Sequence, residues 1–191
     1  MCAVAGAGVL VGALSLQPLR PPRPAPQAMP SPPGQGPITG MPRAVPTKIE
    51  IPAIGVDASL LSLGVDNKDE LAVPPLDHAE LASWYNLGPS PGEPGSAVIV
   101  GHVDSAKIGP AVFFNLGKLK PGDVITVTRQ DGTKPEFKVD SVQTYLKTSF
   151  PTQLVYAGER ATLRVITCGG QFDKKSRNYL SNVVVFASLE T

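Results

Sequence analysis

Short β-like segments separated by Gly, Pro and Asp fill the sequence from Thr47 onward, and this punctuation restricts the possible fold more than any other feature. The segments are rich in β-branched and aromatic residues, which favour strands. The predicted strands are Thr47–Ile51, Ser96–Val100, Asp123–Arg129, Glu136–Tyr145, Ala161–Thr167 and Asn182–Ala187, with weaker candidates at Ala58–Leu63 and Glu70–Val73. A hairpin turn is predicted at Gln130–Thr133, because its Asp-Gly pair accepts a positive φ.

Helical signals are brief in this part of the chain. The segments Leu76–Tyr85 and Ala111–Leu119 are each long enough for two or three helical turns. No long helical period separates the strands, which argues against an α/β fold with crossover helices. The sequence therefore predicts an all-β barrel or sandwich of seven or eight strands with one or two short helices.

Proline divides the chain into two parts. Of the 21 prolines, 11 lie between Pro18 and Pro46. Proline locks φ and lacks an N–H donor, so residues 17–46 are predicted to form a semi-rigid extended linker. Residues 47–191 are enough for one domain and too few for two. After Lys48 the chain carries 13 basic and 16 acidic residues, which gives no electrostatic footprint for nucleic acid.

The first residues are apolar. Cys2–Leu16 carries no charge but falls short of the ~20 residues that a membrane-spanning helix needs. A signal-peptide core, the end of a truncated membrane anchor and a buried helix are the alternatives. No basic region precedes the segment, and Arg20 and Arg23 follow it, so residues 1–16 are predicted to be the end of an anchor whose N-terminus lies upstream. The domain would then stand on a stalk outside the membrane.

The domain has few residues that could perform chemistry. Its single cysteine is Cys168, which follows a predicted strand and precedes Gly169-Gly170. An unpaired cysteine is unusual in an exported protein. Position alone leaves two interpretations open: a cysteine packed in the core, or a reactive thiol where a strand opens into a loop.

Two histidines and an arginine complete the set of candidates. His102 follows the predicted strand Ser96–Val100 and a glycine that allows close approach of another segment, whereas His78 lies in a polar stretch typical of a surface histidine. Arg177 lies on the predicted loop Gly169–Asn178, where an arginine is usually solvated.

Taken together, Cys168, His102 and Arg177 would supply a nucleophile, a proton carrier and a group that stabilises an oxyanion. Asp104 and Asn178 are near in sequence, but position does not identify either as the third member of a papain-like triad. No CxxC pair, closely spaced histidines or Gly-rich phosphate loop is present, so no metal or cofactor is expected.

Several motifs carry a resemblance to a known family. They are Trp84-Tyr85, the run Gly88–Gly95, Gly101-His102-Val103-Asp104, Ile108–Phe113, Leu119–Asp123, Ile166–Gly170 with Phe172-Asp173, Arg177-Asn178-Tyr179 and Asn182–Val185. Together they resemble a sortase of the class E/F group of high-GC Gram-positive actinobacteria, with class F closest, over essentially all of residues 47–187. The family's Thr-Leu-X-Thr-Cys motif reads Arg164-Val165-Ile166-Thr167-Cys168 here.

The resemblance implies a closed eight-stranded sortase-type β-barrel and a membrane-anchored, extracellular cysteine transpeptidase. By similarity, Cys168 attacks the Thr–Gly carbonyl of an LPXTG-like sorting signal, His102 transfers protons, and Arg177 steadies the oxyanion or the substrate backbone. The implied partners are surface proteins with a C-terminal sorting signal, a peptidoglycan precursor amine, and the membrane through the N-terminal segment. A catalytically silent β-domain on a stalk and a cysteine peptidase that only hydrolyses are the alternatives.

Overall fold

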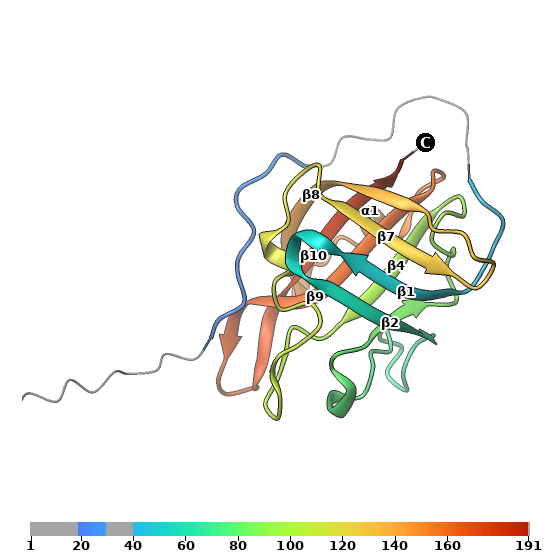
Figure 1. Cartoon of the computed structure of the whole chain (residues 1–191). Helices are drawn as coiled ribbons and strands as arrows, with labels where there is room; N and C mark the ends of the chain where they lie inside the picture. The colour runs from blue at the N-terminus through green and yellow to red at the C-terminus, as the bar shows by residue number, and fades with distance from the viewer. Residues whose placement is uncertain (1–18, 30–39, 191) are drawn as a thin grey trace, which may run out of the picture.

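In the computed structural model, which describes residues 19–29 and 40–190, eight strands pair into a closed barrel (Figure 1). The predicted membrane-anchor segment at residues 1–16 lies outside the described residues. So do residues 17–18 and 30–39 of the predicted linker and the last residue, Thr191. The all-β class predicted from the sequence is confirmed.

The barrel strands follow one another around the wall in the order β1, β2, β3, β4, β9, β10, β8, β7. Their bounds are β1 Pro46–Ile51, β2 Val56–Leu63, β3 Ala82–Tyr85, β4 Ser96–Gly101, β7 Val124–Arg129, β8 Glu136–Leu146, β9 Thr162–Asp173 and β10 Asn178–Leu189. The pairs β2–β3 and β4–β9 are parallel and the others antiparallel. The predicted turn at Gln130–Thr133 joins β7 to the segment before β8, and Gly132 has φ 81° there.

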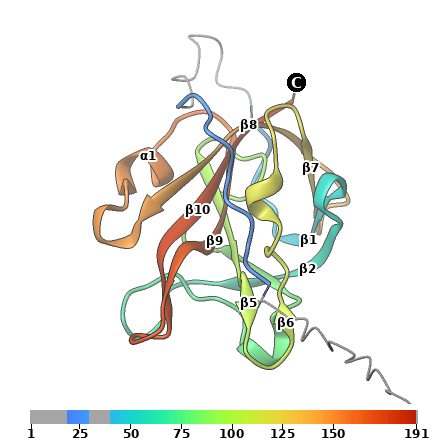
Figure 2. The same ribbon diagram turned by 90° about the vertical axis from the view of Figure 1, so that its left-hand side faces the viewer.

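The remaining elements are small. They are the two-stranded ribbon of β5 (Asp104–Ser105) and β6 (Gly109–Pro110), the 3-10 helices η1 (Pro52–Ile54), η2 (Leu76–His78), η3 (Leu116–Lys118) and η4 (Lys147–Ser149), and helix α1 (Thr152–Tyr156). In Figure 2, β5 and β6 project from the same end of the barrel as the hairpin formed by β9 and β10.

Two predicted helices are wrong. The segment Leu76–Tyr85 forms only η2 and then strand β3. Residues 82–85 pair with β2, and the side chains of Ala82 and Trp84 are buried in the barrel core. In Ala111–Leu119 only η3 is helical: the N–H groups of Ala111 and Val112 donate to carbonyls of neighbouring segments instead of forming a helical ladder. The weak strand predicted at Glu70–Val73 is also wrong, since only a single bridge to Leu71 forms there.

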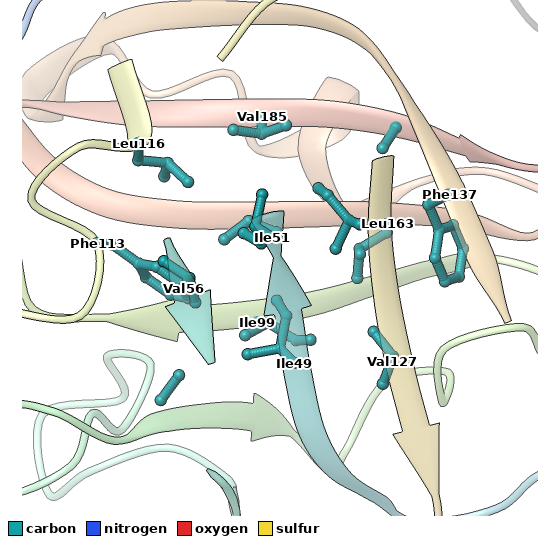
Figure 3. Close-up of a cluster of buried hydrophobic side chains, with 14 of the residues drawn as sticks. Ile49, Ile51, Val56, Ile99, Phe113, Leu116, Val127, Phe137, Leu163 and Val185 are labelled. Atoms are coloured by element: carbon teal, nitrogen blue, oxygen red, sulfur yellow. The ribbon is translucent and has the colours of Figure 1, made fainter. Parts of the chain in front are cut away.

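The core fills the inside of the barrel. Alternate residues of the strands point inward, as the pleat requires, and Figure 3 shows Ile49, Ile51, Ile99, Leu163 and Val185 meeting there. Each fully buried aliphatic side chain contributes about 1.5–3 kcal/mol of transfer free energy. The inside of the barrel is therefore packed with side chains.

A second apolar cluster lies on the outer face of β4, β9 and β10. Its buried members are Val98, Val100, Val155, Ile166, Val184 and Phe186. Because both faces of these strands are covered, their sequences read as nearly continuous apolar runs. Ile166 of this cluster lies two residues before position 168 on β9.

The Pro-rich segment packs on the domain in its described parts. Figure 2 shows residues 19–29, in blue, running between β10 and the segment that contains η3. The side chain of Gln27 accepts a hydrogen bond from the Val142 N–H at 2.7 Å and donates to the Leu119 carbonyl at 3.4 Å. Arg43 donates to the carbonyl of Asn86 at 2.7 Å. Both described stretches of the predicted extended linker therefore make contacts with the domain surface.

Within residues 19–29 and 40–190, none of the helices has the length and apolar character required to cross a membrane.

Candidate active site

Cys168 lies within β9, where it pairs with Asn182 of β10, and its thiol is free and half-buried. The sequence predicted that the strand ends at Thr167 and opens into a loop over Gly169–Asn178. That prediction is wrong: β9 continues to Asp173, and only residues 174–177 form the turn. Cys168 is therefore held by a strand on each side rather than by a flexible loop.

The two glycines after the cysteine explain the difference. Between the pairs Ser181–Gly169 and Tyr179–Phe172 the register shifts, with one extra residue on β9. Gly170 has φ 78°, which is easily adopted only by glycine. This is a β-bulge, and bulges bend a hairpin and redirect nearby side chains without ending the ladder. A Gly-Gly pair that resembles a loop signal is here a bend within a strand.

His102 directly follows β4, and its backbone is fixed by the segment that packs beside it. Its carbonyl accepts a hydrogen bond from the N–H of Phe113 at 3.0 Å. A Cβ on the preceding Gly101 would lie 2.7 Å from the Phe113 ring and from the Val112 side chain. Another segment therefore does approach Gly101 closely, and the approaching atoms belong to the side chains of Val112 and Phe113 rather than to the backbone.

The parallel pairing of β4 and β9 ends shortly before His102 and Cys168. Its last pair is Val100 and Ile166, and each of the two candidate residues follows two positions later. The hydroxyl of Thr167 also donates to the Gly101 carbonyl at 2.8 Å, so the two segments remain in contact up to these positions. Cys168 lies within β9, and because side chains alternate along a strand it shares the outer face with Ile166.

Arg177 lies in the turn at the end of the same hairpin. Asn178 and Asp173 form the last residue pair before the turn, and Arg177 has φ 53° and is exposed. Its side chain makes no hydrogen bond or ion pair with residues 19–29 or 40–190. The Asp173 carboxylate organises the turn by accepting from the Ser176 hydroxyl at 2.6 Å, and this bond holds the pKa of Asp173 below its usual range. The guanidinium is thus available to a ligand.

His78 is a surface residue. It is exposed, and its Nδ1 lies 3.3 Å from the Glu80 carboxylate. The interpretation as a surface histidine agrees with this environment.

The two residues weighed as a third triad member have other partners. The carboxylate of Asp104 accepts a hydrogen bond from the Tyr179 hydroxyl, and Oδ1 of Asn178 accepts one from Lys147 at 3.0 Å. Nε2 of His102 instead lies 2.7 Å from the backbone carbonyl of Pro74. A backbone carbonyl in a distant loop leaves no signal in the sequence that could have predicted this partner.

Tyr179, named from the sequence only as part of a motif, connects two of the segments that carry the candidate residues. It is buried, and its ring packs edge-on against Phe172 with centroids 5.1 Å apart. Its bond to Asp104 ties the segment that follows His102 to the hairpin of Cys168. Burial, then the hydrogen bond and charge of Asp104, and finally Cys168 raise the pKa of Tyr179 above its usual range. Tyr179 and Asp104 both occur in the sequence motifs, but nothing in the sequence indicates that their side chains bond to each other.

We expect Tyr179→Phe to loosen this connection. The substitution leaves the half-buried Asp104 carboxylate without its donor, which costs about 1–3 kcal/mol of unfolding free energy. A raised pKa means that the folded state holds the phenol proton more tightly, so this stabilisation is complete below the usual tyrosine pKa of ~10 and is lost above it. Denaturant unfolding across alkaline pH should therefore show a smaller alkaline loss of stability in Tyr179→Phe than in the wild type. Equal losses of stability in the two proteins would contradict the assigned effect of the Tyr179–Asp104 hydrogen bond.

No group of three or more His, Cys, Asp or Glu side chains that could hold a metal ion occurs in the described ranges 19–29 and 40–190.

Comparison with known proteins agrees with this architecture. The sortase domain family matches residues 49–190, well over half of the chain. A search of curated proteins gave no significant match. Among solved structures, sortase A from Corynebacterium diphtheriae superposes with a TM-score of 0.58 and 23% identity, over 78% of this chain and 62% of that one. The chain thus spans less than two thirds of that relative.

Two further structures have similar values. Sortase C-1 from Actinomyces oris has a TM-score of 0.59 and 21% identity, over 76% of this chain and 73% of that one. The Sortase D5 transpeptidase of Clostridium perfringens has a TM-score of 0.56 and 22% identity, over 78% and 79%. These likenesses confirm the closed eight-stranded sortase-type barrel. The family match over residues 49–190 establishes that the chain belongs to the sortase family.

Proposed function

We propose that this chain is a membrane-anchored transpeptidase that cleaves an LPXTG-like sorting signal between Thr and Gly and joins the released protein to an amine of a cell-wall precursor. The observation that carries the proposal is the β4–β9 register, whose last pair, Val100 and Ile166, lies two residues before His102 and Cys168 in a sortase barrel. A thiol nucleophile next to a proton carrier is the minimum requirement for acyl transfer.

In the first half-reaction, the thiolate of Cys168 attacks the carbonyl carbon of the signal's threonine. A C–S bond forms, and the carbonyl electrons move onto oxygen. Arg177, exposed and unpaired within the described residues, steadies this oxyanion or the adjoining substrate backbone with its planar set of donors. The C–N bond then breaks, and His102 gives its proton to the departing glycine amine, which leaves a thioester on Cys168.

In the second half-reaction, an amine of the cell-wall precursor attacks the thioester. His102 accepts a proton from the incoming nitrogen, the C–S bond breaks, and the thiolate of Cys168 is restored. Water in place of the amine would give hydrolysis. The chemistry is therefore neutral in protons over the whole cycle, and His102 is used in both directions.

The proposed location follows from the sequence. The uncharged residues 1–16 would belong to a single-pass anchor, with the domain on the extracellular face of a Gram-positive membrane. The motifs around His102 and Cys168 support the class E/F group, with class F closest. Because residues 19–29 and 40–45 pack on the domain, the spacer between the membrane and the barrel is shorter than the proline-rich segment as a whole.

The proposal is tested by incubating the full chain with an LPXTG-type peptide, with and without a primary amine, and following products by mass spectrometry. We expect a thioacyl adduct on Cys168 and an amide product when the amine is present. Cleavage that the amine does not divert would identify a hydrolysing cysteine peptidase. Neither adduct nor cleavage with several variants of the signal would identify a catalytically silent domain. Either of these last two results overturns the proposal.

A further inference from the structure

The imidazole ring of His102 has one hydrogen-bond partner among residues 19–29 and 40–190, the carbonyl of Pro74 at 2.7 Å from Nε2. A carbonyl oxygen can only accept, so Nε2 carries a hydrogen whether the ring is neutral or charged. In the neutral ring the lone pair is then on Nδ1. We propose that Pro74 is the positioning residue of this site and makes Nδ1 the atom that exchanges protons; this inference rests on the proposed roles of His102 and Cys168.

The segment that carries Pro74 is held on both sides. Before Pro74, the Ala72 carbonyl accepts a hydrogen bond from the Ser83 hydroxyl of β3 at 2.8 Å. After it, the Ala79 carbonyl accepts one from the Val112 N–H at 3.0 Å. Pro74 itself is buried. The carbonyl that meets His102 therefore lies in a loop that is tied to β3 on one side and to Val112 on the other.

The residue that follows explains the direction of this carbonyl. Pro75 disfavours helical backbone at Pro74 and keeps it extended, and the two pyrrolidine rings fix both φ angles. Pro75 has φ −55° and ψ 147°, and its own carbonyl accepts from the His78 N–H at 2.9 Å. The Pro74 carbonyl is thus oriented before the histidine ring meets it, and little conformational entropy is lost in forming the bond.

The arrangement supplies what a side chain supplies in Cys-His-Asn proteases, where the third group fixes the tautomer and orientation of the imidazole. Here Asp104 and Asn178 are occupied by Tyr179 and Lys147. A backbone carbonyl accepts the same hydrogen bond and does not titrate, so the orientation of the ring does not depend on the protonation of a neighbouring acid.

Only Nδ1 of His102 then exchanges protons during the reaction. A proton passes from Sγ of Cys168 to Nδ1 of His102 when the thiolate forms, and from Nδ1 to the glycine nitrogen when the C–N bond breaks. A second proton passes from the incoming amine to Nδ1 and returns to Sγ of Cys168, which restores the starting state. The other hydrogen stays covalently on Nε2 and is donated to the Pro74 carbonyl throughout.

The tautomer can be measured directly. The chain contains two histidines, so the full chain labelled with ¹⁵N-histidine gives two sets of ring signals in long-range ¹H–¹⁵N spectra, and His78→Gln assigns them. In its neutral form we expect the His102 ring to carry its hydrogen on Nε2. A neutral His102 with its hydrogen on Nδ1 overturns the proposal, whatever the activity of the protein.

A substitution tests the role of the proline framework. Pro75→Gly frees the backbone of Pro74, so we expect a mixture of tautomers at His102 and a fall in kcat of about tenfold, part of the ~10²–10⁴-fold that proton transfer supplies, with KM within about twofold. Pro121→Gly, at an exposed proline in the turn before β7, is the matched control and should leave both readouts unchanged. A Pro75→Gly protein with the wild-type tautomer and kcat contradicts the proposal.

These readouts separate the inference from the proposed function. If His102→Gln remained fully active, the proposed role of His102 would fail, while the tautomer would still report on the contact with Pro74. If the wild-type protein is active but its neutral His102 has the Nδ1 hydrogen, the function stands and the positioning role of Pro74 is wrong.

Discussion

Cys168→Ala is expected to abolish both cleavage of a sorting-signal peptide and amide formation, with kcat/KM lowered by at least ~10³-fold. The sulfur is the atom that bonds to the acyl group, and alanine offers no substitute. Stability should change little, because the thiol is half-buried and lies outside the core that fills the barrel. Circular dichroism and a thermal melt should therefore match the wild type while the thioacyl adduct disappears from the mass spectrum.

The chain offers a matched control, since its only other cysteine is Cys2. Cys2→Ala should keep full activity, and thiol-directed alkylation of that variant should stop turnover by modifying Cys168. Residual transpeptidation by Cys168→Ala, or loss of activity in Cys2→Ala alone, would remove Cys168 as the nucleophile.

The strands that the sequence predicted correctly are those with strong local signals. Ser96–Val100 and Asn182–Ala187 are β-branched runs buried on both faces, so propensity and tertiary structure agree there. Leu76–Tyr85 is long enough for two or three helical turns, and the sequence predicts a short helix there. It forms β3 instead, since pairing with β2 and β4 outweighs a weak local preference. Such a long-range pairing cannot be predicted from propensity.

The sequence proposes a candidate site as a set of residues but not as a geometry. Scarcity points to Cys168, and a matching position after a predicted strand points to His102. Whether the two come close depends on the parallel pairing of β4 and β9, which are far apart in the sequence. The roles of Pro74 and Tyr179 depend on contacts by a backbone carbonyl and a buried hydroxyl. Neither contact has a sequence signature, because any residue has a carbonyl and most buried tyrosines have some partner.

Arg177→Lys is expected to lower kcat/KM by ~10²–10³-fold, the loss typical of removing one donor from an oxyanion site. Lysine keeps the positive charge but lacks the planar fork of donors that fits a developing oxyanion or a peptide carbonyl. The substitution is also conservative for the fold: arginine and lysine have the same backbone cost at φ 53°, and the exposed guanidinium makes no bond to the described residues. Thermal unfolding should therefore be unchanged, and a loss of activity would report on the substrate.

The two roles proposed for Arg177 predict different kinetics. Stabilisation of the oxyanion occurs only in the transition state and would lower kcat with KM unchanged, whereas a hold on the substrate backbone would raise KM. Lys175, an exposed cation of the same turn, provides the control, and Lys175→Ala should change kcat/KM by no more than about twofold, as expected for a screened surface charge. If Arg177→Lys behaves like Lys175→Ala, Arg177 contributes only surface charge, and the oxyanion must be stabilised by backbone N–H groups near Cys168.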